Sequence, residues 1–138
     1  MADQPESTLV KLGDTDLTLA NPADDVRGST VVDRNGNDVG DVDGLLIDEH
    51  EKRVRFLQVG SGGFLGIGEK KRLIPVDAVT AVDEKVHLGA TTRDQVAESL
   101  EYDPDLVQER DYYSGIYDYY GFAPYWGPGY AYPPYPYR

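Results

Sequence analysis

The sequence predicts a mainly β domain: a small barrel of short antiparallel strands, one short helix after it, and irregular segments at both ends. Two observations support this fold. Between Val26 and Leu88, about five or six short apolar runs follow one another with only turn residues between them. A glycine-dense loop from Gly60 to Gly68 joins two of these runs without a helical segment. Closure into a barrel removes the exposed edges that a small twisted sheet would present.

The predicted strands are placed by their turn signals. The Asn35-Gly36 pair is a strong hairpin signal and separates the first two strands. Gly40 and Gly44 interrupt the alternation of the second strand, where glycine often marks a bulge. The expected strands cover residues 29–33, 39–48, 53–59, 72–75, 79–82 and 85–88.

Alternation along these strands predicts the core. Every second side chain of a barrel strand points inward, so one alternating set fills the interior. Leu57 and Val59 are assigned to the opposite face of their strand from Phe56. The predicted core residues are Val31, Val42, Leu46, Val54, Phe56, Ile74, Val79, Val86 and Leu88.

One helix is predicted over residues 91–100. Thr92 and Gln95 fit a capping box, in which the hydroxyl accepts from an early amide and the glutamine reaches back. Val96 and Leu100 are four residues apart and are expected to share one face. Pro104 ends the segment.

Two extensions flank the expected barrel. Residues 1–23 are polar and acidic and are predicted to form a flexible arm, with one possible short strand at 17–20. Residues 105–138 form a tail that holds ten of the eleven tyrosines together with five prolines. Because proline interrupts helices and central strands, this tail is predicted to be disordered. Its tyrosines could be without function, could dock on a partner, or could stack in self-association.

Composition limits the class of partner. A net charge of −12 over 138 residues disfavours nucleic acids and anionic membrane surfaces, which attract Lys and Arg. The chain has no cysteine, and hence no disulfide or thiolate site. No signal peptide and no membrane-spanning run is recognisable. We therefore expect a cytoplasmic protein with no nucleic-acid partner and no integral membrane span.

The motifs do not favour catalysis or metal binding. Residues 33–41 superficially resemble a calcium loop, but Gly44 stands where an EF-hand needs glutamate, so a hairpin turn is favoured. The glycine-rich loop lacks the Lys-Ser/Thr ending of a phosphate loop. His50 and His87 lack ligand spacing, and no serine lies in a nucleophile elbow. No catalytic residue, no metal site and no cofactor is expected.

Several segments, taken in order, carry a family resemblance. They are Arg27-Gly28-Ser29, residues 33–42, residues 63–68 leading to Ile74-Pro75, and Val86-His87-Leu88. Over residues 24–104 the chain resembles the PRC-barrel family, named for the cytoplasmic domain of the photosynthetic reaction-centre H subunit. The C-terminal domain of a ribosome maturation factor has the same fold. The resemblance implies a small SH3-like β-barrel used for protein contacts, in pairs or as an adaptor, without catalytic residues.

The expected function is therefore that of a non-enzymatic adaptor or interaction module, binding an unidentified partner protein or a second copy as a homodimer. Contacts are predicted at the glycine-rich loop, at the basic triplet beside it and in the aromatic tail. Alternatives are a peripheral subunit of a membrane or photosynthetic complex, or a stress-related protein that binds a small ligand. The predicted contact residues are Phe64, Leu65, Ile67, Lys70, Lys71, Arg72, Tyr117, Tyr120, Tyr125 and Trp126.

Overall fold

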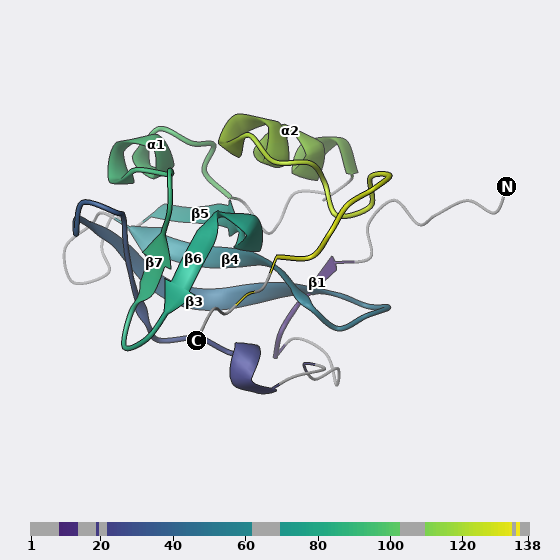
Figure 1. Cartoon of the computed structure of the whole chain (residues 1–138), viewed down its shortest axis with the longest axis horizontal. Helices are drawn as coiled ribbons and strands as arrows, with labels where there is room; N and C mark the ends of the chain where they lie inside the picture. Colours follow the sequence, from purple (N-terminus) through teal and green to yellow (C-terminus); the bar gives the residue numbers. More distant parts are fainter. Residues whose placement is uncertain are drawn as a thin grey trace, which may run out of the picture.

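The protein is a strongly curved β-sheet with two α-helices above it (Figure 1). The computed structural model describes residues 9–13, 19, 22–61, 70–102, 110–133 and 135. Its elements are β1 (Leu9–Lys11), η1 (Pro22–Asp24), β2 (Thr30–Val32), β3 (Asp38–Asp48), β4 (Val54–Ser61), β5 (Lys70–Pro75), η2 (Val76–Ala78), β6 (Val79–Val82), β7 (Val86–Leu88), α1 (Arg93–Ala97) and α2 (Arg110–Tyr120).

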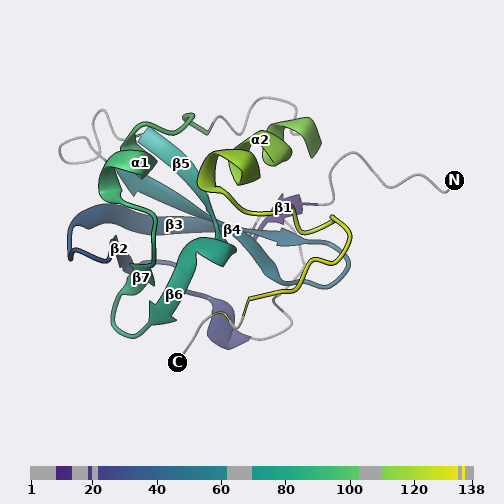
Figure 2. The same ribbon diagram turned by 45° about the horizontal axis from the view of Figure 1, so that its top comes forward.

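The mainly β prediction is confirmed, but the topology differs from a closed antiparallel barrel in two ways. The strand order is β5-β4-β3-β2-β7-β6, with β1 added on β3. The sheet is open, because β5 and β6 stand at the two ends of this order and η2 turns the chain between them directly after Pro75. In addition, β2 and β7 pair in parallel, whereas the other pairs are antiparallel. Figure 2 shows the resulting curvature.

The turn and bulge signals are confirmed. Gly36 has a φ of +83° in the turn between β2 and β3, a conformation that glycine adopts without strain. Gly40 has a φ of +146°, and a Cβ there would lie 2.3 Å from the carbonyl oxygen of Gly60 on β4. The register of β3 shifts on both sides of this point, which bends the strand across the sheet.

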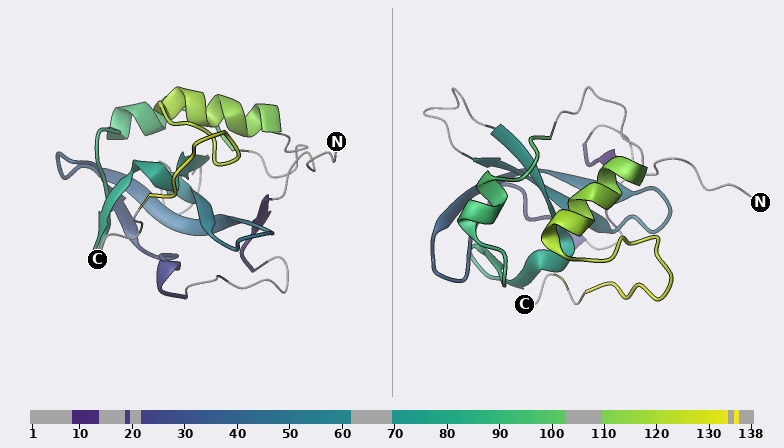
Figure 3. Two further views of the ribbon diagram at one scale, coloured as in Figure 1. Left: turned by 45° about the vertical axis from the view of Figure 1, so that its right-hand side comes forward. Right: turned by 90° about the horizontal axis from the view of Figure 1, so that it is seen from above.

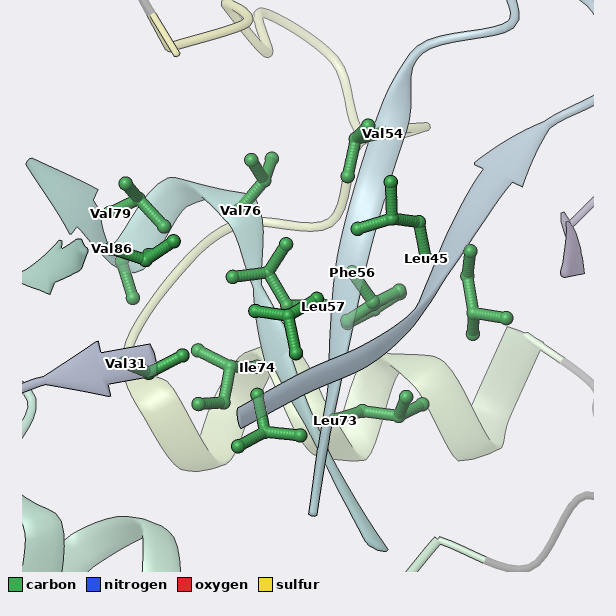
Figure 4. Packing of buried hydrophobic residues seen from close by; sticks show 14 of the residues in the cluster. Val31, Leu45, Val54, Phe56, Leu57, Leu73, Ile74, Val76, Val79 and Val86 are labelled. Atoms are coloured by element: carbon green, nitrogen blue, oxygen red, sulfur yellow. The ribbon is translucent and has the colours of Figure 1, made fainter. Parts of the chain in front are cut away.

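All nine predicted core residues are buried, and they form one cluster with additional residues (Figure 4). The assignment of a single buried face on β4 is wrong, since Leu57 and Val59 are as fully buried as Phe56. Leu57 pairs with Ile74 on β5 and Leu45 on β3. Both faces of β4 are therefore buried, and the face that carries Phe56 is covered by a second layer of the protein.

That second layer is α2, and it corrects the prediction of a disordered tail. The ring of Phe56 on β4 lies 5.4 Å from that of Tyr113 and 4.9 Å from that of Tyr117. Tyr113, Ile116, Tyr117 and Tyr120 are buried and follow a helical spacing of three and four residues. The prolines that argued against a helix begin only after α2, so they do not interrupt it.

The structure also differs from the prediction at the end of the short helix and in the N-terminal arm. The Thr92 hydroxyl accepts from the N–H of Gln95 at 3.2 Å, as the capping motif predicts, but α1 ends at Ala97. Leu100 therefore lies beyond the helix and is exposed, whereas Val96 is buried. Within the arm, β1 pairs with β3 and is not a free segment. Of the possible strand at 17–20, only Leu19 lies within the described residues.

Replacement of Tyr117 by alanine tests whether α2 belongs to the core. Tyr117 is fully buried against Phe56, so Tyr117→Ala should lower the free energy of unfolding by about 3–5 kcal/mol. The control, Leu100→Ala, removes an exposed side chain and should change it by less than about 0.5 kcal/mol. Denaturant unfolding followed by circular dichroism measures both. Equal stabilities of the two variants would contradict the packing.

Candidate functional site

An apolar groove of about 320 Å³ lies between α2, β5 and the segment that follows α1. Leu73 of β5 lines the groove on the sheet side, and α2 contributes the opposite wall. In Figure 3, α1 and α2 lie above the same side of the sheet. The lining residues are Leu73, Ser99, Leu100, Asp111, Tyr112, Gly115, Ile116, Tyr119 and Tyr120.

The segment at residues 99–102 is held along β5 by three contacts. The Arg72 guanidinium donates to the carbonyl oxygen of Ser99. The backbone N–H of Tyr102 donates to the carbonyl oxygen of Lys71 at 2.7 Å. Lys70 forms an ion pair with Glu101 at 3.5 Å. The wall of the groove is therefore fixed to the edge strand by both backbone and side-chain contacts.

Tyr119 links the two helices across the groove. Its hydroxyl donates to the carbonyl oxygen of Gln95 in α1, and the Gln95 side-chain amide donates back to the carbonyl oxygen of Tyr119 at 3.4 Å. Tyr119 is nevertheless 41% exposed, and Leu100 is 68% exposed. These two are the large exposed hydrophobic side chains of the described chain, and both line the same groove. Such a concentration is typical of an interaction surface.

A second cluster surrounds Arg55, which is buried near the start of β4. Its Nε donates to Asp48 at 2.8 Å, and its guanidinium carbon lies 4.5 Å from the ring centre of Tyr125. Tyr132 stacks on the same guanidinium at 5.3 Å. The charge is thus paired and covered by aromatic faces, which attract cations. This surface is filled by the chain's own C-terminal segment.

Hydrogen bonds fix that segment along its length. Tyr132 donates to the carbonyl oxygen of Val54 at 3.1 Å, and Tyr135 donates to that of Asp24 at 2.7 Å. Tyr130 donates to the carboxylate of Asp77 at 2.9 Å. Burial raises the pKa of Asp77, and the Tyr130 hydrogen bond only partly opposes this. The segment after α2 is therefore a packed part of the fold.

The predicted contact residues occupy different environments. Lys71 forms an ion pair with Asp43, so with Lys70 and Arg72 the whole basic triplet has partners within the chain. Tyr117 and Tyr120 are buried in the core of this chain, so in this structure they contact its own residues. The hydrophobic face of α2 that they share was not recognised in the sequence.

Tyr125 and Trp126 are half-buried and pack edge to face at 5.0 Å. Both also pack against the core cluster. Phe64, Leu65 and Ile67 lie outside the described residues. Among the predicted contact residues that the structure describes, Tyr120 alone lines the groove.

The fold and these contacts can be compared with known proteins. A PRC-barrel domain family profile matches residues 20–95, which is more than half of the chain. The chain belongs to the PRC-barrel family. It is 30% identical over 90 residues to an uncharacterized protein of Deinococcus radiodurans, a match that covers 65% of this chain. The aligned part amounts to 31% of that relative's length.

The family match covers β2 to β7 and the first three residues of α1 and ends before the groove is complete. The profile ends at residue 95, whereas Leu100 and α2 lie beyond it. The groove is thus formed where the PRC barrel meets a C-terminal addition. Within the described residues, no group of His, Asp and Glu side chains is arranged to hold a metal ion. No helix in that part of the chain is long and apolar enough to span a membrane.

The buried Asp77 carboxyl predicts a specific pH dependence of stability. Because its pKa is raised in the folded protein, the folded state keeps a proton that the unfolded chain releases near pH ~3.9. The contribution of Asp77 to the free energy of unfolding therefore falls as the pH rises from its pKa in the unfolded chain to its pKa in the folded protein. The stability of Asp77→Asn relative to wild type should accordingly increase with pH, as measured by denaturant unfolding from about pH 3 to pH 7.

Asp25 is the control with the opposite sign. The Arg27 side chain, bonded at 2.7 Å, lowers the pKa of this carboxyl. Wild type therefore gains stability from Asp25 as pH rises through the folded pKa, and the relative stability of Asp25→Asn should fall. Parallel pH profiles for the two variants would contradict the assigned environment of Asp77.

Proposed function

We propose that this PRC-barrel protein is a non-enzymatic protein-interaction module that binds its partner through the groove between α2, β5 and residues 99–102. The exposure of Leu100 and Tyr119 at one groove is the observation that carries the proposal. Family membership supports it, because the resemblance implies a barrel used for protein contacts.

The energetics favour a contact at this position. Transfer of a leucine side chain from water to an apolar environment contributes roughly 1.5–3 kcal/mol, and most of the Leu100 surface is still available for this gain. Tyrosine adds a large rigid surface with a polar end and is enriched among residues that dominate binding energy. The Tyr119 side chain is already oriented by its hydrogen bond to Gln95, so little side-chain entropy remains to be lost on binding.

The aromatic C-terminal segment supports binding indirectly. Its tyrosines cover Arg55 and bond to the barrel, so they position α2. The apolar residues of the glycine-rich loop, Phe64, Leu65 and Ile67, remain predicted as a second contact. The groove is the main candidate because it joins an apolar interior to the exposed side chains of Leu100 and Tyr119.

Site-specific photo-crosslinking tests the proposal in cells that produce the full chain. A photoreactive residue at Leu100 should give one or a few discrete crosslinked protein products, identified by mass spectrometry. The same residue at Glu84, which is exposed on the β6–β7 turn, should not give them. Identical products at both positions, or none at position 100, would reject the groove as the binding surface.

A further inference from the structure

We infer that the occupant of the groove is a basic amphipathic segment of another protein, which inserts an apolar side chain and places Lys or Arg residues against an acidic rim. This inference rests on the proposed function and adds the chemistry of the partner. Three properties of the groove support it: its size, the charges around it, and the ion pairs and hydrogen bonds that the neighbouring cations already form.

The size of the groove restricts what it can hold. A volume of about 150 Å³ accommodates a benzene-sized group, so a groove of about 320 Å³ has room for one or two apolar side chains but not for a whole helix. Leu73 and Ile116 give it an apolar interior. An occupant must therefore lie across the opening and insert an anchor, as the apolar face of an amphipathic helix does.

The rim of the groove is acidic. Asp111 lines the groove, and Asp118 lies seven residues further along α2, two helical turns away on the same side. Glu98 follows α1 and lies close enough to Tyr119 to help raise the pKa of that hydroxyl, after the larger effect of burial. None of these three carboxylates forms an ion pair with a Lys, Arg or His whose side chain the structure describes.

The neighbouring described cations compensate this charge only in part. Lys70 pairs with Glu101 and Lys71 with Asp43. Arg72 is buried and donates to the Ser99 carbonyl oxygen, and its positive charge opposes the effect of Glu98 on the Tyr119 hydroxyl. In a chain of net charge −12, the rim thus offers unpaired negative charge beside exposed apolar surface. Complementary Lys and Arg residues on a partner would speed the encounter and fix its orientation.

A second copy is a poorer occupant of the same groove. Two copies meeting face to face would place Asp111, Asp118 and Glu98 near the same carboxylates of the other molecule. Like charges at an interface oppose association. The acidic rim equally disfavours nucleic acids and anionic lipid surfaces.

Three synthetic helical peptides of about 15 residues test the inference by fluorescence anisotropy with the full chain. The first has a leucine face and a lysine face, the second replaces lysine by glutamate, and the third replaces leucine by serine. The Leu/Lys peptide should bind about tenfold more tightly than either of the others, because only it satisfies both the apolar groove and the acidic rim.

Protein variants locate the binding. Asp111→Asn combined with Asp118→Asn should weaken Leu/Lys binding about fivefold at low salt, and less at high salt. Leu100→Ser should weaken it about tenfold, because an apolar contact is lost. The matched control, Glu49→Gln combined with Glu84→Gln, changes the net charge equally at exposed sites elsewhere and should have less than about a twofold effect. Unchanged circular dichroism confirms that each variant is folded.

The outcomes separate this inference from the proposed function. Equal binding of the Leu/Glu or Ser/Lys peptide, or an equal loss in the matched control, would reject the basic amphipathic occupant. A discrete crosslinked partner at position 100 would then still support the groove as a binding surface. Absence of any crosslink there would reject the groove itself.

Discussion

The contact between β4 and the C-terminal segment determines the rest of the structure. The register between β3 and β4 shifts at Ile47, where Leu46 pairs with Phe56 and Ile47 with Val54, so Arg55 is the extra residue of a bulge. In a regular strand, consecutive side chains point to opposite faces. Here Arg55 and Phe56 both contact the C-terminal segment, Phe56 through α2 and Arg55 through the tyrosines that follow it.

These two contacts differ in physical character. The stacking of Phe56 on Tyr113 and Tyr117 buries apolar surface, which is the main favourable term in folding. Burial of the Arg55 charge is costly, and the Asp48 carboxylate and the aromatic rings offset that cost. Burial raises the pKa of Asp48, but the N–H of Glu51 and the charge of Arg55 lower it by more, so the pair remains ionised.

The groove is a consequence of this packing. Because α2 covers β4 and reaches β5, its outer face lies opposite the segment that follows α1, and the space between them is lined by both. The tail tyrosines hold α2 in place, and the groove is lined by the exposed Tyr119 together with Ile116 and Tyr120, which also belong to the core. A PRC barrel that ended after α1 would have no such groove.

Strands β2 to β7, the glycine bulges of β3 and nine of the core residues could be predicted from sequence because each has a local signal. Glycines at 36, 40 and 44 and the alternation of apolar residues mark them directly. The helix in the tail was missed because its composition was judged over the whole of residues 105–138, although the prolines begin at Pro124. The spacing of Tyr113, Ile116, Tyr117 and Tyr120 would have indicated a helical face.

The groove has no comparable local signal. It combines Leu73 of β5, Leu100 after α1 and residues of α2, which are far apart in the chain. The fold also decides which acidic residues have no ion-pair partner. Lys70 pairs with Glu101 and Lys71 with Asp43, both on other segments of the chain. A sequence motif cannot report such an arrangement, because no single stretch contains it.

Amide hydrogen exchange of the full chain tests most directly whether the tyrosine-rich helix completes the core. Slow exchange at residues 114–120, with protection approaching that of β4, is the result that the packing on Phe56 predicts. Exchange of those amides at the rate of an unstructured peptide, with β4 still protected, would show that the barrel is stable without α2 and would contradict the account.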